Sequence, residues 1–358
     1  MKKRPWLLPF SLLYKMGVMV RNACFDRGLF SSTAFPLPII GIGNLSVGGT
    51  GKTPHTEYLL ELLSGSFKTA VLSRGYKRAT RGFLRYTQGV TATDIGDEPY
   101  QIAQKFPQAY VAVHTDRVAG VKRLLNDKET ADVEVVLLDD AYQHRYIKAG
   151  LQILLIDHNR PIGEDYLLPA GTLREPKEEK RRADIVLITK CPPAIDRTKW
   201  EKNLYLSERQ KLFFSTFQYG ELYYLSSGKC EIRPTRQTHV LLLVGIASPA
   251  PLLEFLKRWT THIEILSFPD HHTFTEADIE KICVAYESMA MPRMFITTEK
   301  DATRLVLHRD VLQDRNVYEE ITVLPIRVKF LENKEQEFNQ IVTDYVTENR
   351  RNSCLPTQ

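Results

Sequence analysis

A glycine-rich segment that ends in Lys and Thr carries the strongest chemical signal in this chain. The letters NLSVGGTGKTP follow a β-branched run, Ile39 to Gly43, and precede an amphipathic stretch, Pro54 to Leu63. Strand, glycine-rich loop and helix are the context in which backbone N–H groups and a helix N-terminus bind phosphate. Lys52 can reach the β- and γ-phosphates of a nucleotide, and the Thr53 hydroxyl can ligate Mg²⁺. The predicted phosphate-binding loop consists of Ser46, Val47, Gly48, Gly49, Thr50, Gly51, Lys52 and Thr53.

One position of this loop departs from the usual pattern. The pattern GxxxxGK[ST] asks for glycine where this chain has Ser46. The two additional glycines, Gly48 and Gly49, can supply the backbone freedom instead. An ordinary glycine-rich turn is the alternative interpretation, but such a turn would not require Lys and Thr directly after Gly51. Phosphate binding is therefore favoured.

Two adjacent aspartates end another predicted strand. The segment VEVVLLDDAYQH has six mostly aliphatic residues, Val133 to Leu138, followed by Asp139 and Asp140. A carboxylate at the end of a strand that neighbours a phosphate loop can hold Mg²⁺ directly or through water. An Asp after a buried strand is also a common turn residue. Taken with the phosphate loop, the pattern predicts that Asp139 binds Mg²⁺.

Two other nucleotide-binding classes fit this sequence poorly. GTPases recognise guanine through [NT]KxD after a late strand, and DIVLITKCP comes close to that motif. However, Pro192 stands where the purine-recognising Asp should be. The dinucleotide pattern GxGxxG is absent after the first strand, where the chain has GIGNLS. Neither a GTPase nor a dinucleotide-binding enzyme is indicated.

Short runs of β-branched and aliphatic residues alternate with amphipathic segments along most of the chain. This alternation is typical of a doubly wound parallel sheet whose strands are buried on both faces. An aromatic-rich segment around 205–235 resembles an antiparallel ribbon, and the alternation restarts after it. The predicted strands are Ile39 to Gly43, Thr69 to Ser73, Ala109 to Val113, Val133 to Leu138, Leu151 to Ile156, Asp184 to Ile188, Val240 to Ser248, Ile263 to Phe268, Met294 to Thr298 and Val323 to Val328.

The length of 358 residues favours two domains, because it exceeds the usual size of one hydrophobic core. We predict an α/β fold in which a P-loop NTPase-type parallel-sheet domain and a smaller C-terminal α/β domain are joined by a two-stranded β-ribbon. The expected divisions are an N-terminal helix at 1–25, the nucleotide-binding domain at 26–208, the ribbon at 209–235, the smaller domain at 236–350 and a polar tail at 351–358.

The composition indicates a water-soluble catalytic body. The chain is 43% hydrophobic and 25% charged, which argues against disorder and against a polytopic membrane protein. A net charge of +5 does not require nucleic acid as a partner, but it suits an enzyme that approaches anionic lipid or nucleotide phosphate. The five cysteines are far apart and show no CxxC spacing, which favours a reducing, cytosolic compartment and no zinc site.

The N-terminus combines basic residues with an apolar stretch. Lys2, Lys3 and Arg4 precede Pro5 to Val20, and Lys15 interrupts that stretch. The uninterrupted part is shorter than the ~20 residues that span a bilayer, and no small-residue cleavage site follows. On a helical wheel Arg4, Ser11, Lys15 and Asn22 share a narrow face, and apolar residues cover the rest. We predict a helix at a membrane interface; a helix packed on the domain is the alternative.

Eight motifs occur in order between residues 41 and 304, and together they resemble the lipid A 4'-kinases, the tetraacyldisaccharide 4'-kinase family. Individually SRGY or ITK would mean little, but the ordered set is highly specific. One motif departs from the family, which usually has Gly at the position of Ala141. The motifs are GNLSVGGTGKTP, SRGYKR (Ser73 to Arg78), GDEP (Gly96 to Pro99), DDAYQH (Asp139 to His144), LPAGTLREP (Leu168 to Pro176), ITK (Ile188 to Lys190), FPDHHTF (Phe268 to Phe274) and TEKDATR (Thr298 to Arg304).

The resemblance implies an enzyme that transfers the γ-phosphoryl group of ATP to the 4'-hydroxyl of a tetraacylated glucosamine disaccharide 1-phosphate, giving lipid IVA. It implies ATP and Mg²⁺ as cofactors and attachment to the cytosolic face of the inner membrane. No nucleic acid and no obligate protein partner are expected. Two alternatives remain open at this point: a P-loop kinase with a soluble acceptor, and a membrane-associated nucleotide switch.

The resemblance also implies roles for single residues. The family's catalytic pair is an Asp and a His, which match Asp97 of GDEP and His272 or His271 of FPDHHTF. Without the family, GDEP would be a polar turn, and DHH a loop that enters the next helix. Glu175 of LREP matches a position that assists Mg²⁺. Guanidinium groups can clamp phosphate, so Arg74, Arg78, Arg117 and Arg174 are candidate substrate contacts, and Asp140, Gln143 and His144 are expected to border the active cleft.

Overall fold

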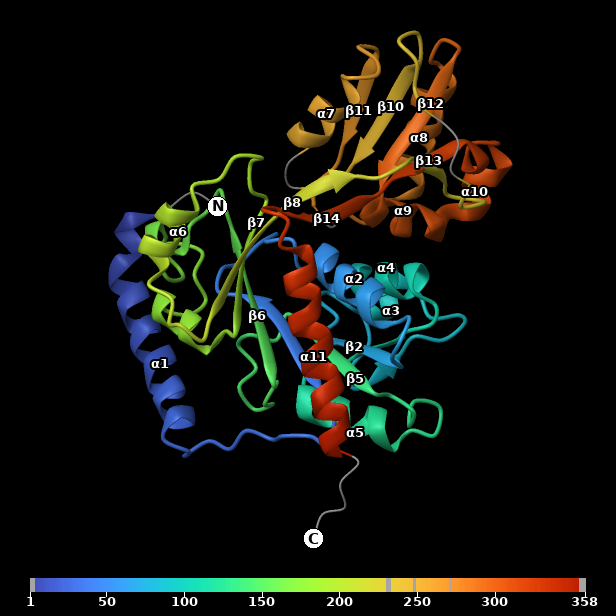
Figure 1. Ribbon diagram of the computed structural model, residues 1–358. Helices are drawn as coiled ribbons and strands as arrows, with labels where there is room; N and C mark the ends of the chain where they lie inside the picture. Colours follow the sequence, from blue (N-terminus) through green and yellow to red (C-terminus); the bar gives the residue numbers. More distant parts are fainter. Residues whose placement is uncertain (1–3, 230–232, 247–248, 271, 354–358) are drawn as a thin grey trace. The chain divides into compact units, whose positions relative to one another are not determined.

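The computed structural model describes residues 4–229, 233–246, 249–270 and 272–353. Lys2, Lys3, His271 and the end of the polar tail, 354–358, lie outside the described residues. The chain forms two compact units. The first comprises 1–90, 102–217 and 328–358, and the second comprises 91–101 and 218–327. Both units are α/β, as the sequence predicts (Figure 1).

The first unit contains a large, mainly parallel sheet with the strand order β14-β8-β7-β6-β1-β5-β2-β4-β3. Strand β1 lies between β5 and β6 and pairs with both in parallel. The six strands predicted between Ile39 and Ile188 are confirmed within two residues at each end. The strands are β1 (Ile39–Asn44), β2 (Thr69–Ser73), β3 (Leu84–Arg85), β4 (Tyr110–Val113), β5 (Val135–Asp139), β6 (Leu151–Asp157), β7 (Ile185–Thr189), β8 (Lys211–Tyr219) and β14 (Ile326–Phe330).

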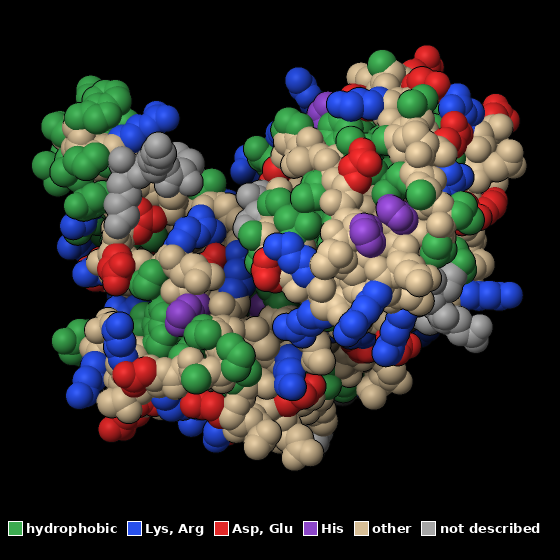
Figure 2. Space-filling model, turned by 90° about the horizontal axis from the view of Figure 1, so that it is seen from above, with side chains coloured by type: hydrophobic (Ala, Val, Ile, Leu, Met, Phe, Trp, Pro, Cys, Tyr) green, Lys and Arg blue, Asp and Glu red, His purple; other side chains and the backbone are tan. Residues whose placement is uncertain are grey.

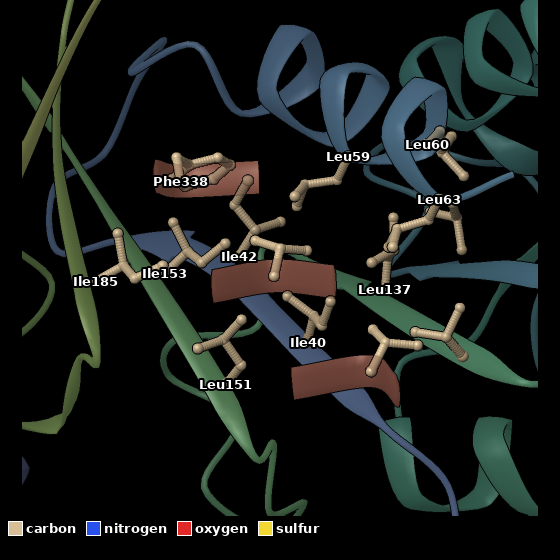
Figure 3. Packing of buried hydrophobic residues seen from close by; sticks show 14 of the residues in the cluster. Ile40, Ile42, Leu59, Leu60, Leu63, Leu137, Leu151, Ile153, Ile185 and Phe338 are labelled. Atoms are coloured by element: carbon tan, nitrogen blue, oxygen red, sulfur yellow. The ribbon is translucent and has the colours of Figure 1, made fainter. Parts of the chain in front are cut away.

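Helices cover both faces of this sheet. The central strands are therefore buried on both sides. One face carries α2 (Lys52–Leu63), the C-terminal part of α4 (Asp97–Lys105) and α11 (Glu335–Ser353). The opposite face carries α5 (Arg117–Asn126) over one half and α6 (Arg197–Leu204) over the other. Figure 3 shows the first of these cores, where labelled side chains from α2, α11 and the central strands meet.

The last helix corrects an expected domain boundary. The sequence assigned 236–350 to the smaller domain, but α11 belongs to the first unit. Its apolar side chains Phe338, Val342 and Val346 are buried in the same core as Ile42 and Ile153 of the large sheet. Figure 3 labels Phe338, Ile42 and Ile153 in this core. The helical spacing predicted the helix itself, but periodicity does not specify which sheet buries its apolar stripe.

The aromatic-rich segment also has different partners from those expected. It was predicted to form an antiparallel ribbon with itself within 209–235. Instead, β8 lies beside β14 and pairs in parallel with β7 in the large sheet. The short strand β9 (Tyr223–Tyr224) pairs antiparallel with β13 (Ile321–Leu324). The two neighbouring strands, β8 and β14, therefore come from distant parts of the sequence.

The second unit has its own sheet with the order β11-β10-β12-β13-β9. Strands β10, β11, β12 and β13 pair in parallel, as the restarted alternation predicted. Two predicted bounds are wrong: the strand expected at Val240 to Ser248 ends at Val244, and the one expected at Val323 to Val328 is divided between β13 of this sheet and β14 of the large sheet. Buried residues on its two faces form separate clusters, one with α8 and one with α7. The remaining elements are β10 (His239–Val244), β11 (Ile263–Ser267), β12 (Arg293–Thr298), α3 (Ala92–Ile95), α7 (Ala250–Leu256), α8 (Glu276–Glu287), α9 (Glu299–Leu305) and α10 (Arg309–Asp314).

The N-terminal helix α1 (Leu8–Asp26) packs its polar face on the protein. Ser11 and Asn22 are buried; Phe10 and Leu12 beside Ser11 are exposed, and Arg21 and Ala23 beside Asn22 are half-buried. The Ser11 hydroxyl donates to the carbonyl of Leu167 at 2.9 Å and accepts from the N–H of Ala170 at 3.0 Å. The apolar side chains of α1 face outward, and Figure 2 shows hydrophobic side chains gathered at the left edge, where α1 lies in Figure 1.

Candidate active site

The glycine-rich loop leaves the buried strand β1 and enters α2, as the sequence predicts. Its left-handed backbone positions fall at Gly48, with φ of 105°, and at Gly51, with φ of 87°. Ser46 is not among the residues with positive φ; it forms an antiparallel β-bridge with Leu173. This explains why the loop tolerates serine where glycine is usual, since extended backbone does not favour glycine.

Polar side chains from neighbouring strand ends form hydrogen bonds with the loop and hold it in place. The Asn44 amide donates to the Thr50 hydroxyl at 2.8 Å, and the Thr189 hydroxyl donates to the Thr50 carbonyl at 2.8 Å. Lys190 donates to the Gly49 carbonyl and forms an ion pair with Asp157 at 2.8 Å. Thr189 and Lys190 belong to the ITK motif. The sequence assigned ITK no role after the GTPase interpretation failed, yet both residues support the phosphate loop.

A buried histidine fixes the end of the loop. His55 Nδ1 lies 2.7 Å from the Gly51 carbonyl oxygen, and its Nε2 lies 3.0 Å from the Ser215 hydroxyl. Burial lowers the pKa of His55 to about 4, so the ring is neutral at physiological pH. A carbonyl can only accept, so Nδ1 carries the proton and Nε2 accepts from Ser215. No sequence motif marked His55, which lies in the amphipathic stretch Pro54 to Leu63.

The loop lysine meets the second of the two aspartates. Lys52 Nζ lies 3.4 Å from Asp140 Oδ1, and Arg174 Nη1 lies 3.1 Å from the same oxygen. Burial alone would raise the pKa of Asp140, but Lys52 and Arg174 outweigh it and hold the pKa below its usual value. Asp140 is therefore a carboxylate between two cations. The structure brings together Lys52, Asp140 and Arg174, which the sequence singled out in three separate motifs.

The first aspartate is more deeply buried and has hydroxyl neighbours. Asp139 ends β5 beside β1, with Thr56 Oγ1 and Ser73 Oγ each 3.4 Å from its carboxylate oxygens. The guanidinium of Arg117 donates to the backbone carbonyl of Asp139 at 3.2 Å and to that of His114 at 2.6 Å. Arg117 was a candidate phosphate contact, but it is buried. These contacts favour a role in holding the backbone at Asp139.

Glu175 is surrounded by donors from three segments. Arg182 forms an ion pair with it, Gln143 Nε2 and Asn22 Nδ2 each lie 3.4 Å from its oxygens, and Arg21 lies 4.0 Å away. The preceding segment runs along the phosphate loop, because the N–H of Val47 donates to Thr172 and that of Arg174 donates to Leu45, both at 2.7 Å. Sequence reasoning missed Arg21, Asn22 and Arg182 as neighbours of this carboxylate.

The other predicted substrate residues have mixed surroundings. Burial, followed by the nearby charge of Arg117, lowers the pKa of His144 to about 4, so this imidazole is neutral. Arg74 is exposed directly after β2. Arg78 donates to the carbonyls of Val113, at 3.5 Å, and Gly82, at 2.5 Å, which gives it a structural role in its own loop.

The predicted catalytic pair lies in the second unit. Asp97 is at the start of α4, where its Oδ2 accepts two hydrogen bonds from the Arg304 guanidinium. His272 Nε2 lies 3.0 Å from Asp278 Oδ2, and Asp278 forms the capping box of α8 with Thr275. The helix-entry interpretation is therefore confirmed for His272, while His271 lies outside the described residues. The pairing of Asp97 with His272 stays a prediction.

A glycine-rich loop between a buried parallel strand and a helix, with its lysine facing an aspartate that follows the adjacent strand, defines the P-loop class of nucleotide-binding proteins. Within that class this chain belongs to the tetraacyldisaccharide-1-P 4'-kinase (LpxK) family, whose model matches residues 3–347. The resemblance drawn from the motifs is confirmed.

Curated relatives match almost the whole chain. A tetraacyldisaccharide 4'-kinase of Bacteroides fragilis is 48% identical over 365 residues, covering 99% of this chain and 96% of that protein. One of Phocaeicola vulgatus is 46% identical, covering 98% of both chains. A crystal structure of LpxK from Aquifex aeolicus in complex with ATP superposes with a TM-score of 0.74 and 29% identity, covering 96% of this chain and 99% of the other. These matches confirm the α/β kinase fold and the enzyme class.

Proposed function

We propose that this chain transfers the γ-phosphoryl group of ATP to the 4'-hydroxyl of a tetraacylated glucosamine disaccharide 1-phosphate. The observation that carries the proposal is the phosphate loop, with Lys52 poised at Asp140, in a chain whose whole length matches the 4'-kinase family. The loop N–H groups and the N-terminus of α2 would bind the ATP phosphates, and Lys52 would reach the β- and γ-phosphates.

The residues around the loop fit a magnesium ion. Mg²⁺ typically takes one or two carboxylates, substrate phosphates and water, and does not need a protein cage. Within the described part of the chain no group of three or more His, Cys, Asp and Glu side chains could hold a metal by itself. Thr53 and Asp139 would bind Mg²⁺ together with ATP, and Glu175 would assist. When bound, the ion neutralises charge on the transferring phosphoryl group.

Asp97 is the proposed proton acceptor. The 4'-hydroxyl must lose its proton as the phosphoryl group arrives, and a positioned carboxylate can take it. Its side chain is 21% exposed, so a substrate hydroxyl can approach it. His272, or His271 in its place, would assist Asp97, as in the family's catalytic pair. Arg74, Arg174, Gln143 and His144 are proposed to contact the substrate.

A phosphorylation assay tests the acceptor. Purified protein with Mg-ATP and the tetraacylated disaccharide 1-phosphate in micelles should yield a bis-phosphorylated lipid, measured by mass spectrometry. The matched control is the same disaccharide 1-phosphate without acyl chains. It should turn over far more slowly, because it has no acyl chains through which to bind. Turnover of the deacylated sugar alone would favour a kinase with a soluble acceptor, and ATP binding without any transfer would favour a nucleotide switch.

We also propose that α1 lies on the cytosolic face of the inner membrane. Among the described helices, none has the length and apolarity needed to cross a bilayer. Ser11 and Asn22 of α1 are buried against the protein, whereas Trp6, Leu13 and Val20 are 72%, 62% and 65% exposed. Leu13 and Val20 are seven residues apart in α1 and therefore share one helical face. Trp6 lies in the 3-10 turn, Pro5–Leu7, that directly precedes α1. An apolar face of this kind, with basic residues at its N-terminal end, suits insertion at the lipid headgroup boundary.

Replacing Trp6, Leu13 and Val20 together by Gln should release the protein from lipid vesicles, because burying each side chain in lipid contributes about 1.5–3 kcal/mol. Vesicle co-sedimentation measures the effect. Val284→Gln with Met291→Gln is the control, since these residues are 51% and 76% exposed in the other unit. Substitution is cleaner than deleting residues 1–22, which would also remove Ser11 and Asn22 from their contacts with the protein. Unchanged sedimentation of the triple variant would contradict an interfacial α1.

A further inference from the structure

The TEKDATR segment forms α9, and the family resemblance left it without a role. Thr298 caps this helix by accepting from the N–H of Asp301. Arg304, in its last turn, is buried and donates from Nε at 3.1 Å and from Nη2 at 2.6 Å. Both bonds end on the same atom, Oδ2 of Asp97. A segment 207 positions away in sequence therefore holds the proposed proton acceptor.

The guanidinium of Arg304 is itself held by a second carboxylate, on an edge that does not bind Asp97. Its Nη1 donates to Asp301 Oδ1 at 3.2 Å. Asp301 is fully buried, and its other oxygen accepts from the N–H of Gly245 at 2.9 Å and from the Thr298 hydroxyl at 2.8 Å. Because the guanidinium is planar, bonds on two of its edges fix both its position and its orientation. Oδ2 of Asp97 is thus bound to a group that has little freedom to move.

A second cation on α9 contacts both segments that carry the predicted catalytic residues. Lys300 Nζ lies 2.8 Å from Asp270 Oδ1 and 3.6 Å from Glu98 Oε1. Glu98 follows Asp97 directly, and Asp270 precedes His272 by two residues. Through Lys300 and Arg304, one short helix contacts the start of α4 and the FPDHH segment.

We propose that Arg304 is a positioning residue that orients Asp97 for proton transfer. The inference rests on the proposed function, in which Asp97 accepts the proton of the acceptor hydroxyl. A general base must be held within roughly 0.5 Å and 10–20° of its productive geometry. Arginine suits this task because its fork fixes a carboxylate, cannot deprotonate and favours the ionised form of its partner. Arg304 acts through Asp97 and does not touch the substrate.

A double-mutant cycle tests the proposal with the full-length protein, Mg-ATP and the lipid acceptor. Arg304→Gln should lower kcat by at least about tenfold and leave the KM values for ATP and lipid within about twofold, since it misplaces the base without removing a substrate contact. Arg304→Lys, which keeps the charge but loses the fork, should fall between the wild type and Arg304→Gln. In an Asp97→Asn background, Arg304→Gln should change kcat by less than about twofold, because the group that it positions is already disabled.

Arg315→Gln is the matched control. Arg315 forms ion pairs with Glu280 and Glu287 in the same unit and should be dispensable for kcat. If Arg304→Gln keeps wild-type kcat, or if its effect multiplies fully with that of Asp97→Asn, the proposal is wrong and the proposed function stands. If Asp97→Asn is fully active, Asp97 is not the base and the positioning role of Arg304 fails with it, while the phosphoryl transfer itself stands. Should thermal unfolding show that Arg304→Gln does not fold, a folded Arg304→Lys with wild-type kcat would still overturn the proposal.

Discussion

Replacing Asp97 by Asn should lower kcat by about 10²–10⁴-fold, the range that general base catalysis supplies. The amide keeps the shape of the side chain and can still accept a hydrogen bond from Arg304, but it cannot take up the proton of the 4'-hydroxyl. ATP affinity should stay within about twofold, because the ATP phosphates are proposed to bind at the loop before α2. Steady-state kinetics with the lipid acceptor and calorimetric titration with ATP measure the two quantities separately.

Asp94→Asn provides a control for this prediction. Asp94 is an acidic residue three positions earlier, and it forms the capping box of α3 with Thr91. Its loss should cost about 1 kcal/mol of stability at most and leave kcat essentially unchanged. A fully active Asp97→Asn enzyme would rule out Asp97 as the proton acceptor. It would leave the family assignment intact, because that assignment does not depend on this residue.

Replacing Lys52 by Met should reduce kcat/KM for ATP by more than about 100-fold. Lys52 supplies the side-chain cation of the phosphate loop, and Met has similar length without charge. The variant also removes one of the two cations at Asp140 and leaves Arg174 as the other, so this carboxylate would repel incoming phosphate more strongly than in the wild type. Loss of binding should appear in calorimetry with ATP, and loss of turnover in the lipid phosphorylation assay.

Lys334→Met is the control for Lys52→Met. Lys334 is a lysine of the same unit that pairs with Glu337 at the surface, where an ion pair contributes about 0–1 kcal/mol. Its loss should leave ATP affinity and turnover as in the wild type. Should Lys52→Met bind ATP as tightly as the wild type does, the phosphates would have to bind elsewhere, and the proposed role of the loop would be wrong.

Local patterns predicted the secondary structure well because the central strands are buried on both faces. Runs such as Val133 to Leu138 and Leu151 to Ile156 are apolar throughout, which alternating surface strands are not. Partner choice was predicted poorly. We predicted that the segment after β8 pairs with β8 itself, and that α11 belongs to the second unit. Both predictions were wrong, because apolar periodicity shows that a face must be buried but not which surface buries it.

The same distinction applies to the candidate site. The phosphate loop is contiguous, and its function depends on local backbone geometry, so the order of Gly51, Lys52 and Thr53 sufficed to predict it. The Lys52–Asp140–Arg174 cluster draws on three segments. Each segment was identified by its motif, but their meeting depends on β1 and β5 being neighbours and on the 172–174 segment pairing with the loop.

The sequence by itself determined the P-loop, the buried strands and the family, since each is written in residues that are adjacent or regularly spaced. Only the tertiary structure decided which groups surround the functional carboxylates: Asn22 and Arg182 at Glu175, and Arg304 at Asp97. The physical reason is that a charged side chain pairs with whichever opposite charge lies near it in the folded protein, however distant that residue is in the sequence. An ion pair between residues 207 positions apart leaves no local pattern in the sequence, because its geometry exists only after both elements have packed.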